Sequence, residues 1–386
     1  MKPRLMDHLV CPLDRTPLEL HEWEGAEQPL TGEQQARAER RGIDPASLAR
    51  EIVTGVLVNR SRGIVYPVYQ GIPRLLTFPT GVARTFAELH GERLRSELPE
   101  CSLPNQPAMP GENDVLRTFS SEWVNYDWDG QSYWNLTPEA WFRCMRFVLR
   151  LDRFPLDGQL VLEVGMGIGG VADYLAREEN CETVGVDLGH AVDAGYRHFG
   201  RNPFLHVVQA SAFALPFADR RFDFVYSFGV IHHTFSTKTA FDGLTRLPND
   251  HGRLYVWVYS PHDENRTLKR RMLMVTERLL RPIVWRLPER AQSVALAPLV
   301  PLYMAHQWFR SLRHQNGAVR YGVREALHAA RDRFTPRYIH RHSEEEVCDW
   351  FREAGYSELS RGSERPRPDF VPIAFTASTG VSGIRQ

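Results

Sequence analysis

The sequence predicts an α/β protein whose core is a doubly wound, mostly parallel sheet. Between about residues 115 and 260, short apolar runs alternate with helical patterns, which is the order of parallel βαβ units. A glycine-rich turn follows the first of these runs, where the chain is expected to pass from strand to helix. The length of 386 residues leaves room for smaller parts beside one core.

Five runs have the Val-rich, apolar character of strands that are buried on both faces of a parallel sheet. They are LVLEV (160–164), ETVGVD (182–187), FLHVVQA (204–210), FDFVYSF (222–228) and GRLYVWVY (252–259). Ser343 followed by Glu346 predicts a capping box and a late amphipathic helix. Two last runs, YSELSRG and FVPIAFTAS, would complete a seven-stranded Rossmann-like sheet.

The same patterns divide the chain into five parts. Residues 1–77 form a small β-rich domain with turn signals at Arg62-Gly63 and Gln70-Gly71, and its polar stretch 32–52 is predicted to be helical. Four parts follow: a Pro- and Gly-containing linker (78–114), the core (115–260), a helical insertion after the fifth strand (261–335), and a C-terminal part with a helix and the last two strands (336–386).

Composition argues against several classes of protein. Lys+Arg and Asp+Glu both number 47, so the basic surplus of a dedicated nucleic-acid binder is absent and a nucleic-acid partner is not expected. The apolar run 291–309 contains Pro298 and Pro301 and is too short to span a bilayer. No signal peptide is recognised, and no two of the five cysteines form a CxxC pair, which indicates reduced thiols and a cytoplasmic protein.

The first strand and its turn, VLEVGMGIGGVADYL (161–175), carry the strongest chemical signal. Gly165, Gly167 and Gly169 allow a tight turn and the close approach of a ligand to the following helix. The spacing Gly165-x-Gly167-x-x-Gly170 also satisfies the dinucleotide fingerprint. Glu163 separates the two interpretations, because a carboxylate there repels an anionic pyrophosphate and suits a ligand with an ammonium and a sulfonium.

Asp187 ends the second strand, 24 residues after Glu163. A carboxylate at this place can accept hydrogen bonds from both hydroxyls of a ribose, and the alternative is that it caps the following helix. A third element, ASAFALPFADRRFDFVYSF (210–228), contains a turn whose backbone and polar side chains can contact an adenine edge.

Together these elements resemble the class I S-adenosylmethionine-dependent methyltransferases, particularly the ubiquinone-type and small-molecule group. The resemblance covers residues 115–260 and, more loosely, 335–376, and it implies S-adenosylmethionine as the cofactor. The cofactor-binding residues that it implies are Glu163, Gly165, Met166, Gly167, Gly169, Asp187, Leu188, Ser211, Ala212, Phe213, Phe228 and Trp123.

Three positions depart from the family pattern. Ser211 stands where the family usually has Asp, which weakens the expected hydrogen bond to the adenine amino group. Met166 and Ile168 replace small polar residues and make the methionine end more apolar.

The aromatic segment TFSSEWVNYDWDGQSYW (118–134) precedes the first strand, where the family folds over cofactor and substrate. Trp123 could contact the sulfonium by a cation–π interaction, and Tyr126 is a candidate catalytic residue. The alternative is a hydrophobic lid without specific contacts. In GVIHHTFS (229–236), His232 or His233 could accept a proton from the acceptor, although methyl transfer does not require a dedicated base.

A second resemblance concerns the N-terminal domain. LVCPLDRTPLEL (9–20) and VNRSRGIVYPVYQGIPRLL (58–76) are similar to the zinc-ribbon-like domains that accompany or activate some tRNA and protein methyltransferases. Cys11 stands alone, Asp14 replaces the second cysteine of CPxC, and Asn59 and Ser61 lie where later cysteines are expected. One cysteine cannot supply a tetrahedral zinc site, so no metal and a scaffold or interface role are predicted.

In the insertion, Lys and Arg alternate with Leu, Trp, Met and Phe. A lid that forms an acceptor pocket, a membrane-surface element and a homodimer interface are all open interpretations. The sequence as a whole predicts methyl transfer to a small or medium-sized acceptor, including an apolar or lipid-like one. The alternatives are an RNA or protein methyltransferase and a catalytically inactive cofactor-binding partner.

Overall fold

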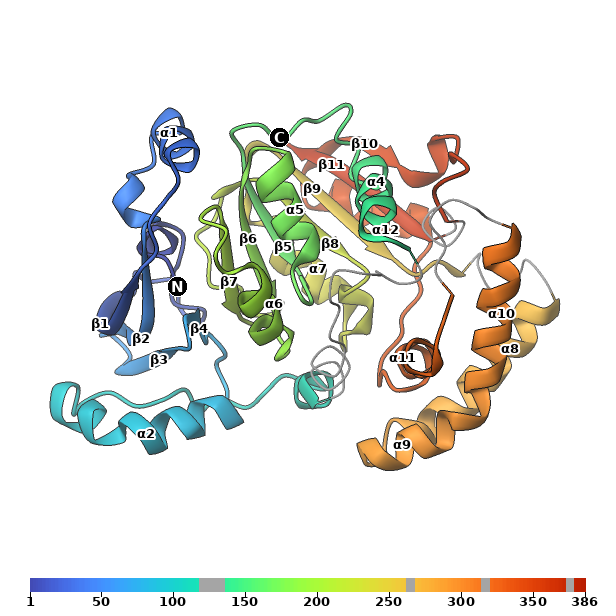
Figure 1. Ribbon diagram of the computed structural model, residues 1–386, viewed down its shortest axis with the longest axis horizontal. Coiled ribbons are helices and arrows are strands. Elements are labelled where there is room, and N and C mark those ends of the chain that lie inside the picture. The colour runs from blue at the N-terminus through green and yellow to red at the C-terminus, as the bar shows by residue number, and fades with distance from the viewer. Residues whose placement is uncertain (118–135, 262–267, 314–319, 373–377) are drawn as a thin grey trace.

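Two sheets organise the described residues of the computed structural model, which are 1–117, 136–261, 268–313, 320–372 and 378–386 (Figure 1). The larger sheet has the order β10-β11-β9-β8-β5-β6-β7, and the smaller N-terminal sheet has the order β1-β2-β3-β4. In Figure 1 the N-terminal domain and the helical insertion lie on opposite sides of the larger sheet.

The larger sheet confirms the predicted doubly wound, seven-stranded architecture. Its parallel strands are β5 (Leu160–Val164), β6 (Glu182–Asp187), β7 (Leu205–Gln209), β8 (Phe222–Phe228) and β9 (Pro248–Val258). The strands β10 (Tyr356–Arg361) and β11 (Thr379–Arg385) follow, and β11 runs antiparallel between β9 and β10. Because β5 and β8 lie in the middle of this order, the carboxyl ends of the parallel strands meet where the connections change sides.

The last strand, β11, begins after the predicted run FVPIAFTAS (370–378), so its predicted position was wrong; residues 373–377 of that run lie outside the described residues. The observed strand β11 contains Gly380 and Gly383, and both are surrounded by large side chains. A Cβ atom at Gly380 would lie 2.8 Å from the Tyr255 hydroxyl, and one at Gly383 would lie 2.9 Å from Phe351. Crowding therefore selects small residues here and removes the apolar pattern that marks the other strands.

Helices cover both faces of the larger sheet. On one face, α4 (Pro138–Val148), α5 (Gly170–Glu178) and α6 (Ala191–Phe199) pack on Val161, Phe224 and Tyr226. On the other face, α7 (Thr237–Thr245) and α12 (Glu344–Glu353) pack on Leu162, Val225 and Val256. Ser343 caps α12 by accepting a hydrogen bond from the Glu346 backbone at 3.1 Å, which is half of the predicted capping box; the Glu346 carboxylate pairs with His342 at 2.9 Å instead of with the Ser343 backbone.

The N-terminal domain contains β1 (Glu19–Glu27), β2 (Arg50–Asn59), β3 (Ile64–Tyr69) and β4 (Ile72–Pro73), all antiparallel. The two predicted turns occur at Gly63 and Gly71, which both have positive φ. The helix predicted over 32–52 is shorter: α1 (Gly32–Arg40) ends before a short 3-10 turn, Pro45–Ser47. Helix α2 (Gly81–Glu97) lies in the segment for which the sequence predicted only a linker.

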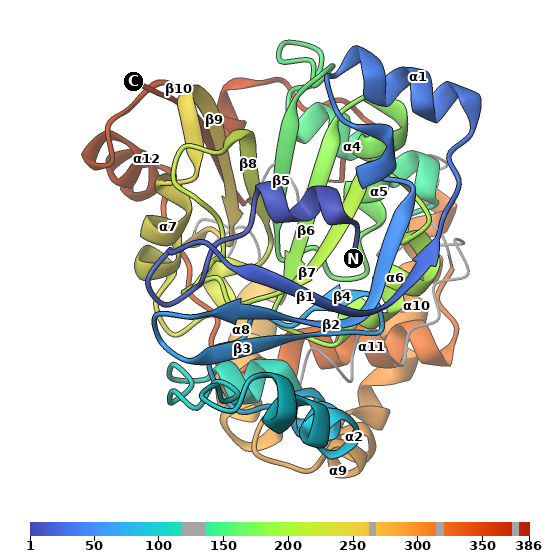
Figure 2. The ribbon, with the colours of Figure 1, turned by 90° about the vertical axis from the view of Figure 1, so that its left-hand side faces the viewer.

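The N-terminal domain packs along the β7 edge of the larger sheet (Figure 2). The Leu75 amide donates to the Gln209 carbonyl at 2.8 Å, and Arg74 forms a parallel β-bridge with Gln209. Apolar side chains join the two parts as well, since Ile43 and Leu48 share a core cluster with Phe204. The open edge of the sheet is therefore covered by the same chain.

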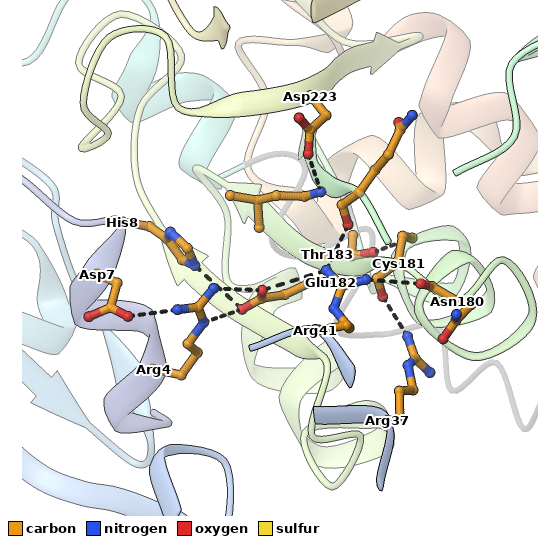
Figure 3. A network of polar contacts seen from close by, with 12 residues as sticks. Arg4, Asp7, His8, Arg37, Arg41, Asn180, Cys181, Glu182, Thr183 and Asp223 are labelled. Atoms are coloured by element: carbon orange, nitrogen blue, oxygen red, sulfur yellow. Dashed lines mark hydrogen bonds and ion pairs between the residues drawn. The ribbon is translucent and has the colours of Figure 1, made fainter. Parts of the chain in front are cut away.

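A buried carboxylate, Glu182 at the start of β6, anchors this contact (Figure 3). Arg4 donates to it through Nε at 3.0 Å and Nη2 at 3.1 Å, and His206 lies 3.0 Å away. These partners hold the pKa of Glu182 well below its usual value, against the opposing effect of burial. Arg37 and Arg41 add hydrogen bonds to backbone carbonyls of residues 181 and 180.

The insertion after β9 is helical, as predicted. It contains α8 (Leu268–Val284), α9 (Glu289–Leu296), α10 (Val300–Arg313) and α11 (Val323–Phe334). A small apolar core with Val284, Leu296, Ala330 and Phe334 joins α8, α9 and α11. In the part of the chain that the structure describes, no helix combines the length and the hydropathy needed to cross a bilayer.

Candidate functional site

A cavity of about 550 Å³ opens at the carboxyl ends of β5, β6 and β8. One end is lined by strand ends and the turns that follow them, and the other by the insertion. Of the residues that the sequence singled out, those in contact with the cavity are Glu163, Gly165, Met166, Gly167, Ile168, Asp187, Leu188, Ser211, Ala212, Phe213, Phe228 and His233.

The turn after β5 requires its glycines. Gly165, Gly167 and Gly169 have φ values of 86°, 54° and 80°, in the left-handed region that side chains disfavour. A Cβ atom at Gly165 would also lie 2.2 Å from Val230. Gly169 is the N-cap residue of α5, so the turn presents backbone rather than side chains to the cavity.

Glu163, on β5, places a carboxyl group in the wall of the cavity at the end formed by the strand ends. Only 6% of the residue is exposed, and its Oε2 atom has no hydrogen-bond partner among the described residues. Burial, with a smaller contribution from the nearby Asp187 carboxylate, raises the pKa of Glu163 to about 8. An unpartnered, buried carboxylate oxygen that lines a cavity fits a cationic group of a ligand.

Asp187 lies at the end of the neighbouring strand and contacts the glycine turn. Its carboxylate accepts hydrogen bonds from the Gly167 amide at 2.9 Å and the Gly189 amide at 2.7 Å. Burial nevertheless raises its pKa to about 6. The next helix begins at Ala191 with His190 as its N-cap residue, so Asp187 is not the cap of that helix.

The third strand end pairs Ser211 with an acid that sequence reasoning missed. Ser211 donates a hydrogen bond to Glu112, and its own Oγ accepts one from the Phe213 amide at 3.0 Å. Glu112 is 4% exposed and is held by the Met109 amide at 2.7 Å. A carboxylate thus stands where the family pattern expects an Asp, although it comes from the segment predicted to be a linker.

Met166 and Ile168 contribute less to the cavity than the sequence suggested. They are only 6% and 3% exposed and belong to core clusters behind the turn. The Met166 thioether lies over Gly185 and Gly195, where a Cβ atom would collide with it. These two residues therefore mainly support the turn from behind, which is compatible with their apolar character.

Aromatic rings line the middle of the cavity. Phe228 stacks on Trp257 with ring centres 4.6 Å apart, and Trp141 meets Phe228 edge-on at 6.1 Å. Trp141 and Trp257 were not selected from the sequence, because each lies in a helix or strand whose apolar pattern already accounts for it. The aromatic candidates that were selected, Trp123 and Tyr126, lie outside the described residues.

The two adjacent histidines occupy different environments. His233 lines the cavity, and its Nδ1 donates to the Tyr338 carbonyl at 3.0 Å, so Nε2 is the unprotonated nitrogen. Burial lowers its pKa to about 4, which makes it a neutral but weak base. His232 is fully buried against Tyr259 and does not line the cavity, so it has no direct contact with a ligand there and the proposed base role is not supported for it.

The insertion closes the other end of the cavity with charged side chains. Glu277 on α8 is 1% exposed and receives Arg333 Nε at 3.1 Å and Arg341 Nη2 at 3.3 Å, with Arg281 as a further partner. Asp332 also lines this end, and burial raises its pKa to about 6. This end can therefore bind polar groups beside the aromatic walls.

The residues that replace cysteines in the N-terminal domain do come together. The Asn59 amide donates to Asp14 at 3.0 Å, and Asp14 also accepts hydrogen bonds from Thr16 and Arg62. Ser61 donates to Asn59 at 2.7 Å. No group of three or more His, Cys, Asp or Glu side chains suited to a metal ion occurs within the described residues, and hydrogen bonds join the two loops here.

Comparison with protein families yields two matches. Residues 162–256 match the family model of a methyltransferase domain, and residues 2–71 match that of a Trm112p-like protein. The first match includes Glu163, the glycine turn, Asp187 and Ser211. The second covers most of the N-terminal domain.

Each curated relative matches about a third of this chain. Mouse probable tRNA methyltransferase 9B is 32% identical over 146 residues, which are 36% of this chain and 30% of that protein. Phosphoethanolamine N-methyltransferase 2 of Caenorhabditis elegans is 25% identical over 127 residues, 32% of this chain and 29% of the relative. The chain therefore spans less than a third of the length of these relatives. They do not single out the small-molecule group that the sequence resembles.

Solved structures show weaker likenesses. Phosphoethanolamine N-methyltransferase 2 of Haemonchus contortus has a TM-score of 0.44 and 12% identity, covering 73% of this chain and 62% of its own. Magnesium protoporphyrin IX methyltransferase of Synechocystis has a TM-score of 0.42 and 14% identity. The likeness covers 71% of this chain and 98% of that protein. TM-scores below 0.5 do not establish the fold, which rests instead on the strand order observed in this chain. The chain thus carries a match to a Trm112p-like protein over 2–71, followed by a match to a methyltransferase domain over 162–256.

Proposed function

We propose that the cavity binds S-adenosylmethionine and that the protein transfers its methyl group to a small or medium-sized acceptor. The observation that carries this proposal is the unpartnered, buried oxygen of Glu163 beside a glycine turn. Two further acids line the same cavity: Asp187 at the end of β6, and Glu112, which accepts a hydrogen bond from Ser211 just after β7. The match to a methyltransferase domain supports the same conclusion.

Each acid fits one part of the cofactor. Glu163 would accept hydrogen bonds from the ammonium group, Asp187 from the ribose hydroxyls, and Glu112 with Ser211 from the adenine amino group. When bound, S-adenosylmethionine supplies an electrophilic methyl group on a sulfonium. The rings of Phe228 and Trp257 exclude water from the middle of the cavity and offer aromatic faces to a cation.

The acceptor would occupy the end of the cavity that the insertion closes. Tyr259 provides apolar surface there, and Glu277, Arg333 and Arg341 provide charged groups. His233 can take a proton at Nε2, although its low pKa makes it a weak base. The chain therefore acts mainly by positioning and desolvating the acceptor, which is sufficient for an already activated methyl donor.

A nucleic-acid acceptor is the second candidate. It is favoured by the relative named as a tRNA methyltransferase and by the Trm112p-like match of the N-terminal domain. The equal numbers of acidic and basic residues argue against it, since phosphate contacts supply most of the affinity for RNA.

Two measurements test the proposal. Calorimetry with S-adenosylhomocysteine should show one site per chain, and NAD should not bind. Labelled methyl from S-adenosylmethionine should then appear in a small-molecule extract, and ribonuclease treatment should not reduce it. Label in tRNA would instead favour the second candidate, while binding without any transfer would indicate an inactive cofactor-binding protein. Absence of binding would refute the proposal.

A further inference from the structure

The insertion exposes an unusual amount of apolar surface. Nine of the twelve large apolar side chains that are exposed among the described residues lie on α8, α9 and α10. We define the apolar face by the eight most exposed of them, which are between 44% and 75% exposed: Val275, Leu279, Ile283, Val294, Leu302, Trp308, Phe309 and Leu312. Surfaces of this kind mark sites of interaction with a partner or a membrane.

The apolar side chains of α8 form one stripe. Val275, Leu279 and Ile283 follow one another at four-residue spacing, and they are 56%, 67% and 61% exposed. Met274 and Glu277 on the same helix are buried and line the cavity. The helix is therefore apolar on the side that faces away from the protein, the reverse of an ordinary surface helix.

The same helices carry a strong positive charge. Residues 268–313 contain nine Lys and Arg and only two Glu, a net charge of +7 in a chain whose overall net charge is zero. Arg278, Arg286 and Arg290 are exposed at the positions beside the apolar residues. One of the two acids, Glu277, is buried in the cavity wall, so it offers little compensation at the surface.

Three kinds of partner could cover an apolar, basic surface, and two of them fit poorly. A second copy of the chain would place +7 against +7 in a symmetric contact. RNA would match the charge but would leave Val275, Leu279 and Ile283 without apolar contacts, because nucleic acids are bound through phosphates and stacked bases. An anionic lipid surface satisfies both features, since aliphatic side chains enter the headgroup region while arginines contact phosphates.

We propose that α8, α9 and α10 dock the protein on an anionic membrane surface through the apolar face. The contact is peripheral, because no described helix is suited to span a bilayer. Docking places the membrane against the helices that close the cavity: Glu277 on α8 and Tyr303 on α10 line the cavity from inside. An apolar acceptor could then reach the cavity from the bilayer.

The proposal is tested by sedimentation of the purified protein with lipid vesicles. Vesicles of phosphatidylcholine with 25% phosphatidylglycerol are compared with pure phosphatidylcholine at 0.1 M and 0.5 M NaCl. Partitioning onto the anionic vesicles should be at least tenfold stronger and should fall with salt. The variant Leu279→Ser/Ile283→Ser should lose at least nine-tenths of this binding.

Leu89→Ser is the matched control, because Leu89 is 62% exposed on α2, outside the insertion. It should bind vesicles like the parent protein, and both variants should keep the parent unfolding temperature since all three leucine and isoleucine side chains are exposed. Equal binding to both kinds of vesicle, or full binding by the double variant, would overturn the proposal. The proposal would also be overturned if the parent protein did not bind vesicles and instead formed a dimer in light scattering, or bound tRNA in a gel-shift assay, and if the double substitution abolished that interaction.

Discussion

The two ends of the cavity are built in different ways. At the end proposed to bind the cofactor, Glu163, Asp187 and Ser211 lie at or just beyond the ends of the neighbouring strands β5, β6 and β7 and line the same cavity. At the acceptor end, Glu277 and Arg333 are contributed by separate helices of the insertion and reach one another through long side chains.

At one end of the cavity the backbone fold determines the geometry of the site, and at the other end individual side chains determine it. Left-handed glycines and adjacent strand ends leave the cofactor end few alternatives, because a change there alters backbone geometry. The acceptor end can change its shape and charge by single substitutions on exposed or half-buried helices, which leave the sheet intact. Specificity for the acceptor is therefore expected to reside in the insertion.

The largest expected effect is at the cofactor end. Asp187→Ala should weaken S-adenosylhomocysteine binding about 100-fold, or about 3 kcal/mol, since two hydrogen bonds to a charged acceptor are lost. Calorimetry measures this. Asp250→Ala, at an exposed carboxylate on β9, is the control and should bind normally. Unchanged binding by the Asp187 variant would show that the ribose assignment is wrong.

The protonation of Glu163 should make cofactor binding depend on pH. Burial raises the pKa of Glu163 to about 8, so the free protein holds this carboxyl largely protonated at pH 7. The ammonium of the ligand needs the ionised form, and affinity should therefore rise about tenfold between pH 6.5 and 7.5, with release of a proton. Titration at several pH values tests this, and Glu163→Gln should bind weakly with no such dependence.

At the acceptor end, Arg333→Met should lower kcat/KM for methyl transfer about tenfold, as expected for the loss of one charged hydrogen bond. S-Adenosylhomocysteine affinity should stay within twofold of the parent value. Arg324→Met, at an exposed position on the same helix, should change neither quantity. A parallel loss of cofactor affinity in the Arg333 variant would contradict the division of the cavity into two ends.

The smallest effect is expected for His233. Burial lowers its pKa to about 4, so it is neutral at pH 7 and its imidazole is a weak base. His233→Ala should reduce the single-turnover rate by less than tenfold, whereas an efficient general base contributes about 100-fold or more. A loss above that size would mean that proton removal by His233 limits the reaction.

Much of the cofactor end could be predicted from the sequence. The runs 160–164, 182–187 and 222–228 coincide with β5, β6 and β8, since strands buried on both faces must be apolar throughout. Glu163 and Asp187 could be assigned because they are the penultimate residue of one such strand and the last residue of the next. The contact of Asp187 with the Gly167 amide follows from the parallel pairing of β5 and β6.

Three other features could not be predicted, because no pattern in the neighbouring sequence indicates them. Glu112 reaches Ser211 across 99 positions of sequence, so no spacing identifies the pair. Strand β11 was misplaced because close packing selects glycine at positions 380 and 383. The charged end of the cavity depends on how α8 and α11 pack, and a pattern of Lys, Arg and Leu does not specify which arginine faces inward.

The attachment of the N-terminal domain has a consequence for the integrity of the larger sheet. The last strand of an open sheet exposes unpaired amides and carbonyls to which a foreign strand can add. In this chain the backbone at Arg74 and Leu75 occupies that position on β7, and the charges on Arg4 and Glu182 neutralise one another within the contact. A core freed from residues 1–77 would expose the edge of β7 and would leave Glu182 without Arg4, with His206 still beside it, so it should aggregate rather than remain as a smaller folded unit.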